Sequence, residues 1–495
     1  MRFYIAVLGS LSILALCVCI ACTSPVSDAT ETVPDGSSYT YITYGTEHPN
    51  YYCKITEVQT NTSILYIPTV LEGYDVKILA SGAFENCPAS SIIIPKNVTL
   101  IENGAFTKCT NLDQVYFLGE CPSMENAFPN GTAFYCLPDN GDYPPGTVVI
   151  ETTTVNGILY GHFPDGWMAL GGTPTGETIE ICPMIDEEPV VSVGPYSFSG
   201  TMQSNGEVLR RTDIKEVIIP DTVGNIRERS FYYCDVEKVT FSESIVAIHD
   251  ESFRAAYHLD DLSFPDSLEY IGFECFRDCH DLKILTLTNN ITFLGEGAFY
   301  ICESLKTACL QTSSLPNRIF GYCSNLESIE LLGSPTSIGN LAFYNCFKVN
   351  NVKIPNSVKT IGNASFFSCT SLNSIDLGSV ETIGNEGFRN CSSLSTISLP
   401  GSLKSMGTYS FADCTVLTSV KAYGPCPEGN STVFLNDPAT IHCSQEHYDS
   451  WNNSQFGIAV ESDLNADGDH WLLWITLLSI LIIGIGTIIL FRKLH

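Results

Sequence analysis

A repeated pair of residues runs through most of this sequence and limits the folds that the chain can adopt. A phenylalanine is followed three residues later by a cysteine in ten places, and from Phe231 onward the phenylalanines of this frame lie 21 to 23 residues apart. Such a fixed period is typical of a solenoid, in which each repeat forms one turn and buries its apolar face against the next turn. The pairs are Phe84/Cys87, Phe106/Cys109, Phe231/Cys234, Phe276/Cys279, Phe299/Cys302, Phe320/Cys323, Phe343/Cys346, Phe366/Cys369, Phe388/Cys391 and Phe411/Cys414.

The apolar frame around each pair predicts which side chains point inward. In the repeat "IPNSVKTIGNASFFSCTSLNSIDL" (354–377), apolar and polar residues alternate near the end of the segment from Leu372 to Leu377. This alternation predicts a short strand with Ser374 and Asp376 pointing outward. Neighbouring strands lie about 4.8 Å apart, so the inward side chains of successive turns form continuous rows.

The repeated cysteine belongs to this apolar frame. One copy has Ala256 in its place, which indicates that the position takes a small apolar group, and we therefore expect buried free thiols. Disulfides between neighbouring turns are the alternative. However, the run from Cys279 to Cys414 has seven members, an odd number that cannot pair completely. A metal site needs several ligands that converge, whereas these cysteines occur once per repeat.

The repeats carry a family resemblance. The stretches "IENGAFTKCTNLDQVYF", "LGEGAFYICESLKTACL", "IGNLAFYNCFKVNNVKIP" and "IGNEGFRNCSSLSTISLP" resemble the BspA-like class of leucine-rich repeats, over roughly residues 64–422 apart from an insertion-rich middle. The resemblance implies a repeat solenoid, a β-rich leucine-rich-repeat fold of 22–23-residue period with short parallel strands. It also implies a surface antigen or adhesin, since BspA-like proteins are associated with adhesion to host tissue, matrix proteins and other microbes.

A larger duplication divides the repeats into two arrays. "YDVKILASGAF" (74–84) is similar to "EPVVSVGPYSF" (188–198), and the ending at 115–136 is similar to the ending at 420–443. We therefore predict a short array at 37–145 and a long array at 146–455, each closed by a cap that covers the end of its core. Both endings carry two cysteines, which are either disulfides closing the caps or buried thiols; they are Cys121 with Cys136 and Cys426 with Cys443.

The two ends of the chain predict a membrane anchor. Residues 1–22 have the pattern of a secretory signal peptide. Residues 471–491 carry no charge and are long enough to cross a hydrocarbon core of about 30 Å. An acidic stalk at 456–470 precedes this transmembrane helix, and a basic tail at 492–495 follows it, so we expect a single-pass plasma-membrane protein with its ectodomain outside the cell.

Composition and motifs exclude several classes of function. The formal net charge of −30 argues against a nucleic-acid partner, because phosphate contacts need clustered basic residues. The sequence has no glycine-rich phosphate loop, no GxSxG elbow and no HExxH motif. His442 and His447 are the only histidines close together in the second cap, and the first cap has no equivalent. We therefore predict no enzyme, no catalytic residue, no metal site and no cofactor.

The outward positions of the strands are the predicted binding surface. They are mostly small and polar, lack the Trp, Tyr and Arg of typical hot spots, and suit an extracellular protein or glycan ligand. The predicted ligand-binding residues are Ser263, Thr286, Ser328, Glu330, Asn351, Lys353, Ser374, Asp376, Thr396, Ser398, Ser419 and Lys421. We predict an adhesin or surface antigen; the alternative is a structural or antigenic coat protein without a dedicated ligand.

N-x-Ser/Thr triplets predict glycosylation of a secreted chain. The predicted acceptors are Asn61, Asn97, Asn130, Asn290, Asn363, Asn430 and Asn452.

Overall fold

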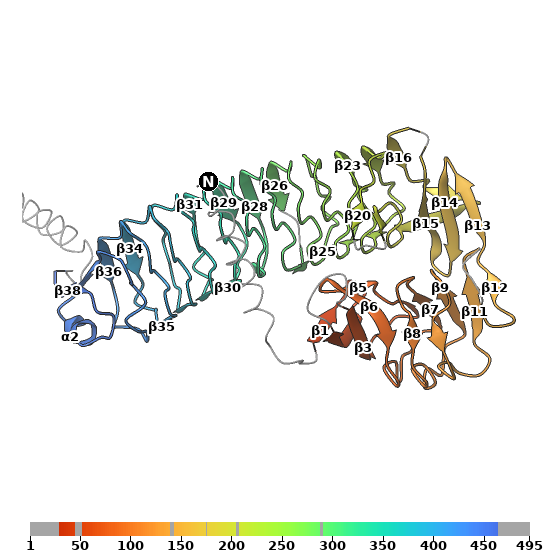
Figure 1. Cartoon of the computed structure of the whole chain (residues 1–495), viewed down its shortest axis with the longest axis horizontal. Helices are drawn as coiled ribbons and strands as arrows, with labels where there is room; N and C mark the ends of the chain where they lie inside the picture. The colour runs from red at the N-terminus through yellow and green to blue at the C-terminus, as the bar shows by residue number, and fades with distance from the viewer. Residues whose placement is uncertain are drawn as a thin grey trace, which may run out of the picture. The chain divides into compact units, whose positions relative to one another are not determined.

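The structure is a computed structural model, and it describes residues 29–44, 52–138, 143–174, 176–203, 207–287 and 291–463 (Figure 1). The chain divides into two compact units, an amino-terminal unit (Met1–Glu303) and a carboxyl-terminal unit (Ser304–His495), and each is considered by itself. The predicted signal peptide, transmembrane helix and tail lie outside the described residues. Among the residues that are described, no helix is both long and apolar enough to span a membrane.

The amino-terminal unit starts with two sheets, which together form the first array. The first sheet contains β1 (Ala29–Thr32), β2 (Ser38–Tyr44), β3 (Tyr52–Gln59), β5 (Val70–Leu71), β6 (Tyr74–Leu79), β8 (Leu100–Ile101) and β10 (Ser123–Met124). The second sheet contains β4 (Ile64–Tyr66), β7 (Ser91–Ile94), β9 (Gln114–Phe117), β11 (Ala133–Cys136) and β12 (Val148–Val149). Strand β1 pairs with β2, so the ordered array begins before the predicted start at residue 37.

The rest of the amino-terminal unit forms the first turns of the second array. Its strands are β13 (Thr152–Val155), β14 (Ile158–Phe163), β15 (Gly166–Gly172), β16 (Thr178–Glu180), β17 (Met184–Ile185), β18 (Glu188–Val193), β19 (Thr201–Met202), β20 (Val208–Leu209), β21 (Glu216–Ile218), β22 (Asn225–Ile226), β23 (Lys238–Thr240), β24 (Ala247–Ile248), β25 (Tyr270–Ile271), β26 (Ile284–Leu287) and β27 (Phe293–Leu294). No described sheet joins strands β1–β12 to the strands that follow them, although one apolar cluster brings Ile93 and Tyr116 together with Phe163 and Met168.

The carboxyl-terminal unit is a stack of repeat turns with parallel strands (Figure 1). Its elements are β28 (Thr307–Leu310), β29 (Ser328–Leu331), β30 (Ser337–Ile338), β31 (Asn351–Val352), β32 (Thr360–Ile361), β33 (Thr382–Ile383), β34 (Thr396–Leu399), β35 (Ser405–Met406), β36 (Ser419–Ala422), β37 (Thr440–Cys443), α2 (Tyr448–Asn452) and β38 (Ala459–Glu461).

One predicted strand is not formed. Leu372, Ile375 and Leu377 are buried as expected, but this turn makes only isolated bridges at Asp376. The Asp376 side chain accepts a hydrogen bond from the Gly378 backbone nitrogen at 2.9 Å, and Gly378 has φ +52°. Such a local turn competes with the strand ladder, whereas the equivalent segment of the next repeat forms β34.

Stacked phenylalanine rings form the core of the carboxyl-terminal unit. Phe343 lies 4.9 Å from Phe366, which lies 5.0 Å from Phe388, measured between ring centroids. The stack continues through Phe411 and Phe434 with the rings close to parallel. Each repeat forms one turn of the solenoid, so its phenylalanine ring lies directly over the ring of the previous repeat. This stacking confirms the predicted apolar frame.

The last turn is closed by residues beyond the predicted end of the array at 455. Phe456 packs edge-on against the final ring, Phe434, and Trp451 of α2 packs against Phe456. The Trp451 indole nitrogen donates a hydrogen bond to the Gly424 carbonyl at 2.9 Å. Strand β38 then pairs with β37, so the cap includes the first residues of the predicted stalk.

The repeat cysteines are buried free thiols, as predicted, and they also have a polar role. The Cys369 thiol donates to the Phe343 carbonyl of the previous turn at 3.3 Å, and the Cys391 thiol donates to the Phe366 carbonyl at 3.2 Å. The same contact recurs at Cys109, Cys279, Cys302, Cys346 and Cys414. The thiol therefore fills a small apolar space and also satisfies a buried carbonyl, which alanine at position 256 cannot do.

We expect these thiols to be free but protected. Burial raises the pKa of the Cys369 thiol, which disfavours the reactive thiolate. A maleimide reagent should label the native full-length protein only at partly exposed cysteines such as Cys182 and Cys309, and should label the repeat cysteines after denaturation without prior reduction. Mass spectrometry of the labelled peptides measures this, and labelling of the repeat cysteines only after reduction would show that they are disulfide-bonded.

An asparagine ladder joins successive turns. Asn340 Oδ1 accepts a hydrogen bond from the Asn363 backbone nitrogen at 2.7 Å, and Asn363 Oδ1 accepts one from the Asn385 backbone nitrogen at 2.8 Å. The preceding glycine allows this close approach, because a Cβ on Gly362 would lie 2.7 Å from the Asn340 nitrogen. The repeated Ile-Gly-Asn sequence is therefore a link between turns.

Candidate functional site

The strand face of the carboxyl-terminal unit consists of the outward residues of β28, β29, β31, β34, β36, β37 and β38. Two parallel rows run along it. The first row contains Thr307, Ser328, Asn351, Ser374, Thr396, Ser419 and Thr440, and the second contains Cys309, Glu330, Lys353, Asp376, Ser398, Lys421, His442 and Glu461. In a parallel pair the residues opposite each other lie on the same side of the sheet, so each row runs on within β28–β31 and within β34–β38. Between these two sheets, Asp376 bridges Lys353 to Ser398 in the second row.

The predicted outward residues are accessible where the structure describes their side chains. Glu330, Lys353, Ser374, Asp376, Thr396 and Lys421 are exposed, while Ser328, Ser398 and Ser419 are half-buried. In the amino-terminal unit Ser263 and Thr286 are exposed. Asn351 begins β31, and its side chain is outside the described set. The division into inward and outward positions is confirmed; the ligand-binding role stays a prediction.

The second row carries charges of both signs. Lys353 is paired with Asp376 in the ladder, and Lys421 is paired with His442, which in turn is paired with Glu461. His442 and Glu461 were missed from the sequence because the repeat frame ends at Lys421, and only the cap continues the row.

Exposed apolar side chains lie where two of these strands end. Leu332 follows β29 and is 52% exposed, and Tyr423 follows β36 and is 54% exposed. The rows themselves carry no aromatic residue among the described positions. A partner lying across the strand face would therefore meet polar rows and apolar contacts at their edge.

His442, Glu461 and Asp463 have donor atoms within 4.8 Å of one another. His442 Nδ1 lies 2.8 Å from an Asp463 oxygen and 3.6 Å from a Glu461 oxygen, and both carboxylates are more than half exposed. An exposed ion-pair cluster accounts for this geometry, and we assign no metal to it.

The predicted cap cysteines are all thiols in the structure. Burial raises the pKa of the Cys121 thiol, and the neighbouring Cys136 adds to the effect. The cap disulfides stay a prediction.

The glycosylation sites also stay a prediction. Four of the predicted acceptors are exposed: Asn61, Asn130, Asn363 and Asn452. Asn430 is half-buried, and Asn290 lies outside the described residues. The Asn97 amide nitrogen donates to the Thr69 carbonyl at 2.6 Å, so a glycan there would replace a structural contact.

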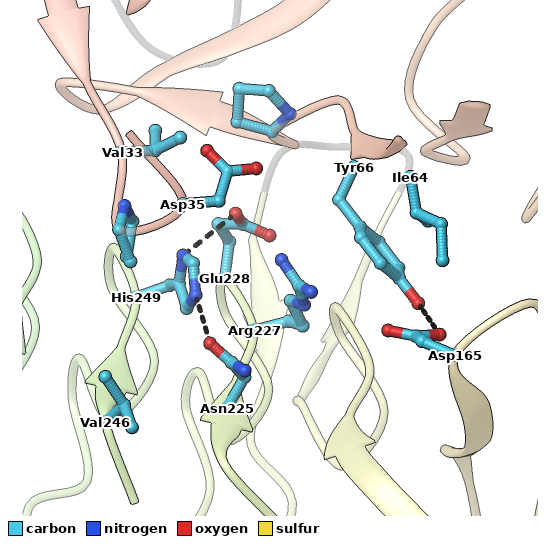
Figure 2. Close-up of a pocket in the computed structure, with 12 residues that line it drawn as sticks. Val33, Asp35, Ile64, Tyr66, Asp165, Asn225, Arg227, Glu228, Val246 and His249 are labelled. Atoms are coloured by element: carbon cyan, nitrogen blue, oxygen red, sulfur yellow. Dashed lines mark hydrogen bonds and ion pairs between the residues drawn. The ribbon is translucent and has the colours of Figure 1, made fainter. Parts of the chain in front are cut away.

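A cavity of about 320 Å³ lies within the amino-terminal unit, between the first array and the first turns of the second array (Figure 2). The first array contributes Asp35 and Tyr66, and the later turns contribute Asp165, Arg227 and His249. No sequence pattern indicated this cavity, because its walls come from segments that are far apart in the chain.

A buried ionic network lies beside this cavity. Arg229 contacts Asp75 of the first array at 2.5 Å, the Tyr196 hydroxyl at 2.6 Å and Glu251 at 2.8 Å. The side chains of Arg229 and Glu251 are 6% and 0% exposed. Arg254 also contacts Glu251, at 3.3 Å. These contacts join the two arrays within the amino-terminal unit.

Two carboxyl groups of the same region lack full hydrogen bonding. Burial raises the pKa of Glu31 well above its ordinary value, and the charge of Asp250 adds to the effect. Burial likewise raises the pKa of Asp250. One oxygen of each group is buried without a hydrogen-bond partner among the described residues, which adds to the cost of ionising either group.

Known proteins support the repeat assignment. The sequence profile described as BspA type leucine rich repeat region matches residues 50–134, 205–327 and 313–439, which is more than half of the chain. No curated protein matches the chain.

Several solved structures are similar to this one. A leucine-rich repeat protein from Bacteroides ovatus is 21% identical, with 63% of this chain and 100% of that chain covered and a TM-score of 0.42. A leucine rich cell surface protein from Faecalibacterium prausnitzii is 19% identical, with 89% of this chain and 100% of that chain covered and a TM-score of 0.34. The pneumococcal vaccine antigen PcpA is 15% identical, with 89% of this chain and 100% of that chain covered and a TM-score of 0.40.

Proposed function

Because the chain belongs to the BspA-type leucine-rich repeat family, we propose that it is a cell-surface protein whose strand face binds an extracellular protein or glycan. A non-enzymatic binding role fits this repeat scaffold, which presents extended surfaces rather than a catalytic cleft. The anchor at 471–491 and the external orientation are parts of the same proposal, taken from the sequence.

The continuity of the second polar row, which Asp376 carries from one sheet to the next, is the observation that supports the proposal. Paired positions from Lys353 to Glu461 place acidic, basic and neutral polar side chains along one line, so the row carries charges of both signs. A row with charges of both signs favours a partner that also carries both signs and disfavours a partner of uniform charge, since like charges brought together oppose binding.

The second candidate is a coat antigen without a dedicated ligand. The small Ser and Thr side chains of the first row favour it, because they offer little area to a partner and none of the residue types that dominate hot spots. In that case the net charge of −30 serves mainly to keep crowded copies apart.

A charged variant of the first row separates the two candidates. We expect the triple substitution Ser374→Glu, Thr396→Glu and Ser419→Glu to weaken binding of the full-length protein to host cells or matrix-coated surfaces by at least about tenfold, because three new carboxylates would remain without partners. Surface plasmon resonance or a cell-adhesion assay measures the change.

The matched control is a second Ser/Thr ladder in the same unit. Thr360, Thr382 and Ser405 are paired across β32, β33 and β35, in a different sheet from the strand face. The same three Glu substitutions there should leave binding unchanged. Equal binding by both triple variants would contradict the strand-face site, and absence of binding by the unmodified protein would favour the coat antigen.

A further inference from the structure

The polar groups of the cavity in the amino-terminal unit are only partly used by the protein. Arg227 stacks on the Tyr66 ring at 3.8 Å from its centroid, yet no hydrogen bond joins its guanidinium to any described residue, and its Nε is buried and unpaired. Figure 2 shows this guanidinium between Glu228 and Tyr66, at the wall of the cavity. An arginine held flat by an aromatic ring keeps its donors in a fixed plane for a ligand.

Acceptor groups lie on the same walls. One oxygen of Asp35 accepts from the Ser37 backbone nitrogen at 2.8 Å, and one oxygen of Asp165 accepts from the Tyr66 hydroxyl at 2.7 Å. The second oxygen of each carboxylate has no hydrogen bond to the described part of the chain. These first bonds orient the carboxylates, so that the remaining oxygens are available to a ligand.

Glu228 and His249 form the more closed side of the cavity. Glu228 lies 3.4 Å from His249 Nδ1 and 3.5 Å from the Thr69 hydroxyl, and His249 Nε2 lies 3.4 Å from the Asn225 side-chain oxygen. Burial raises the pKa of Glu228, but the hydrogen bond from His249 and the charges of His249 and Arg227 outweigh it and leave the pKa below its ordinary value. Glu228 is therefore ionised and contributes a third negative charge.

This mixture of charges selects against simple ions. A free anion would meet three carboxylates, and a free cation held by those carboxylates would leave the donors of Arg227 without a partner. A hydroxyl group both donates and accepts, so a ligand with several neighbouring hydroxyls can satisfy the arginine and the aspartates together. Val33, Pro68 and Val246 add apolar wall for the carbon face of such a ligand.

The size of the cavity limits the ligand further. About 320 Å³ is at the lower end of small-molecule sites and is enough for one sugar ring but not for a long chain. We propose that this cavity binds one neutral monosaccharide unit, as the end residue of a glycan. The site uses none of the strand-face residues, so the experiments can contradict one of the two proposed binding sites without contradicting the other.

Ligand-observed NMR and calorimetry on the full-length protein test the proposal. The probes are glucose, galactose, mannose and N-acetylglucosamine, with glucuronic acid and glucosamine as charged comparators. We expect saturable binding of at least one neutral sugar with a Kd on the order of 1 mM, and binding of its charged comparators at least about tenfold weaker. Absence of binding by every neutral sugar, or tighter binding of a charged one, would overturn it.

Two variants locate the site. Val246 is 41% exposed at the cavity, so Val246→Trp should fill the space without removing a polar group and should abolish sugar binding. The control is Thr292→Trp, at the exposed residue that precedes Phe293 just as Val246 precedes Ala247 in the same sheet. Asp165→Asn keeps an acceptor for Tyr66 and should weaken binding by about tenfold. Unchanged binding in both Val246→Trp and Asp165→Asn would contradict the assignment.

Discussion

Replacing Phe366 with alanine is expected to lower the free energy of unfolding by about 4 kcal/mol. Phe366 is fully buried and stacks between Phe343 at 4.9 Å and Phe388 at 5.0 Å. The substitution removes the apolar surface of the ring, leaves a cavity between two turns, and breaks two ring contacts worth about 1 kcal/mol each. Because each turn touches only its neighbours, both interfaces of this repeat are weakened together.

Urea unfolding followed by circular dichroism measures this effect, and Phe347 provides the control. Phe347 lies on the same turn as Phe343 in sequence but is 44% exposed, so Phe347→Ala should change the free energy of unfolding by no more than about 0.5 kcal/mol. Equal losses in the two variants would show that the ring stack does not hold the turns together.

The repeat turn itself could be predicted from the sequence, because its causes are local and periodic. The Phe and Cys positions recur every 21 to 23 residues, and their burial in every described turn follows from that spacing. The same periodicity separated the exposed Ser374 and Asp376 from the buried Ile375. Where a side chain forms its own turn, as Asp376 does, the apolar pattern is right but the strand is absent.

Contacts between turns were only partly visible in the sequence. The Ile-Gly-Asn sequence recurs, but residue type alone does not indicate that the Asn340 side chain accepts a hydrogen bond from the backbone of Asn363. The carbonyl partner of Cys369 is the backbone of Phe343, 26 residues away, and a backbone partner leaves no trace in residue type. Trp451 lies in the cap and has no counterpart in the repeats, so the repeat frame could not indicate its role.

The cavity and the ionic network were not predictable because their partners are distant in sequence. Arg229 and Asp75 are separated by 154 residues, and each lies in a segment whose local pattern is that of an ordinary turn. Only the packing of the first array against the later turns brings them together. The candidate sugar site depends on the same packing, since Tyr66 and Arg227 come from the two sides of it.

We expect Arg229→Met to destabilise the amino-terminal unit by about 3 to 5 kcal/mol. The substitution keeps the length of the side chain but removes the charge that faces Glu251 and Asp75. Glu251 is fully buried, and among the described residues it would keep Arg254, at 3.3 Å, as its ion-pair partner. Limited proteolysis should then cleave the first array faster, because the Arg229–Asp75 contact that joins it to the later turns is lost.

A double variant distinguishes the loss of an ion pair from the loss of packing. In Arg229→Met with Glu251→Gln, the uncompensated buried charge is removed, so part of the lost stability should return even though no ion pair is restored. Asp75→Asn is the milder control, since Asp75 is 28% exposed and remains able to accept a hydrogen bond. If the double variant were as unstable as the sum of its single variants, Arg229 and Glu251 would act independently.

The pH dependence of the same variants gives an independent measurement. Burial raises the pKa of Glu251, but the charges of Arg229 and Arg254 outweigh it, and the pKa lies below its ordinary value. The ion pair therefore stabilises the folded state above the ordinary pKa of a carboxyl group, and this stabilisation is lost as the pH falls through the lowered value. In Arg229→Met the opposing charge is reduced and burial dominates, so protonation of Glu251 becomes favourable in the folded state. We therefore expect acid to destabilise the unmodified protein more than the variant, and the difference in unfolding midpoint between them to narrow as the pH is lowered.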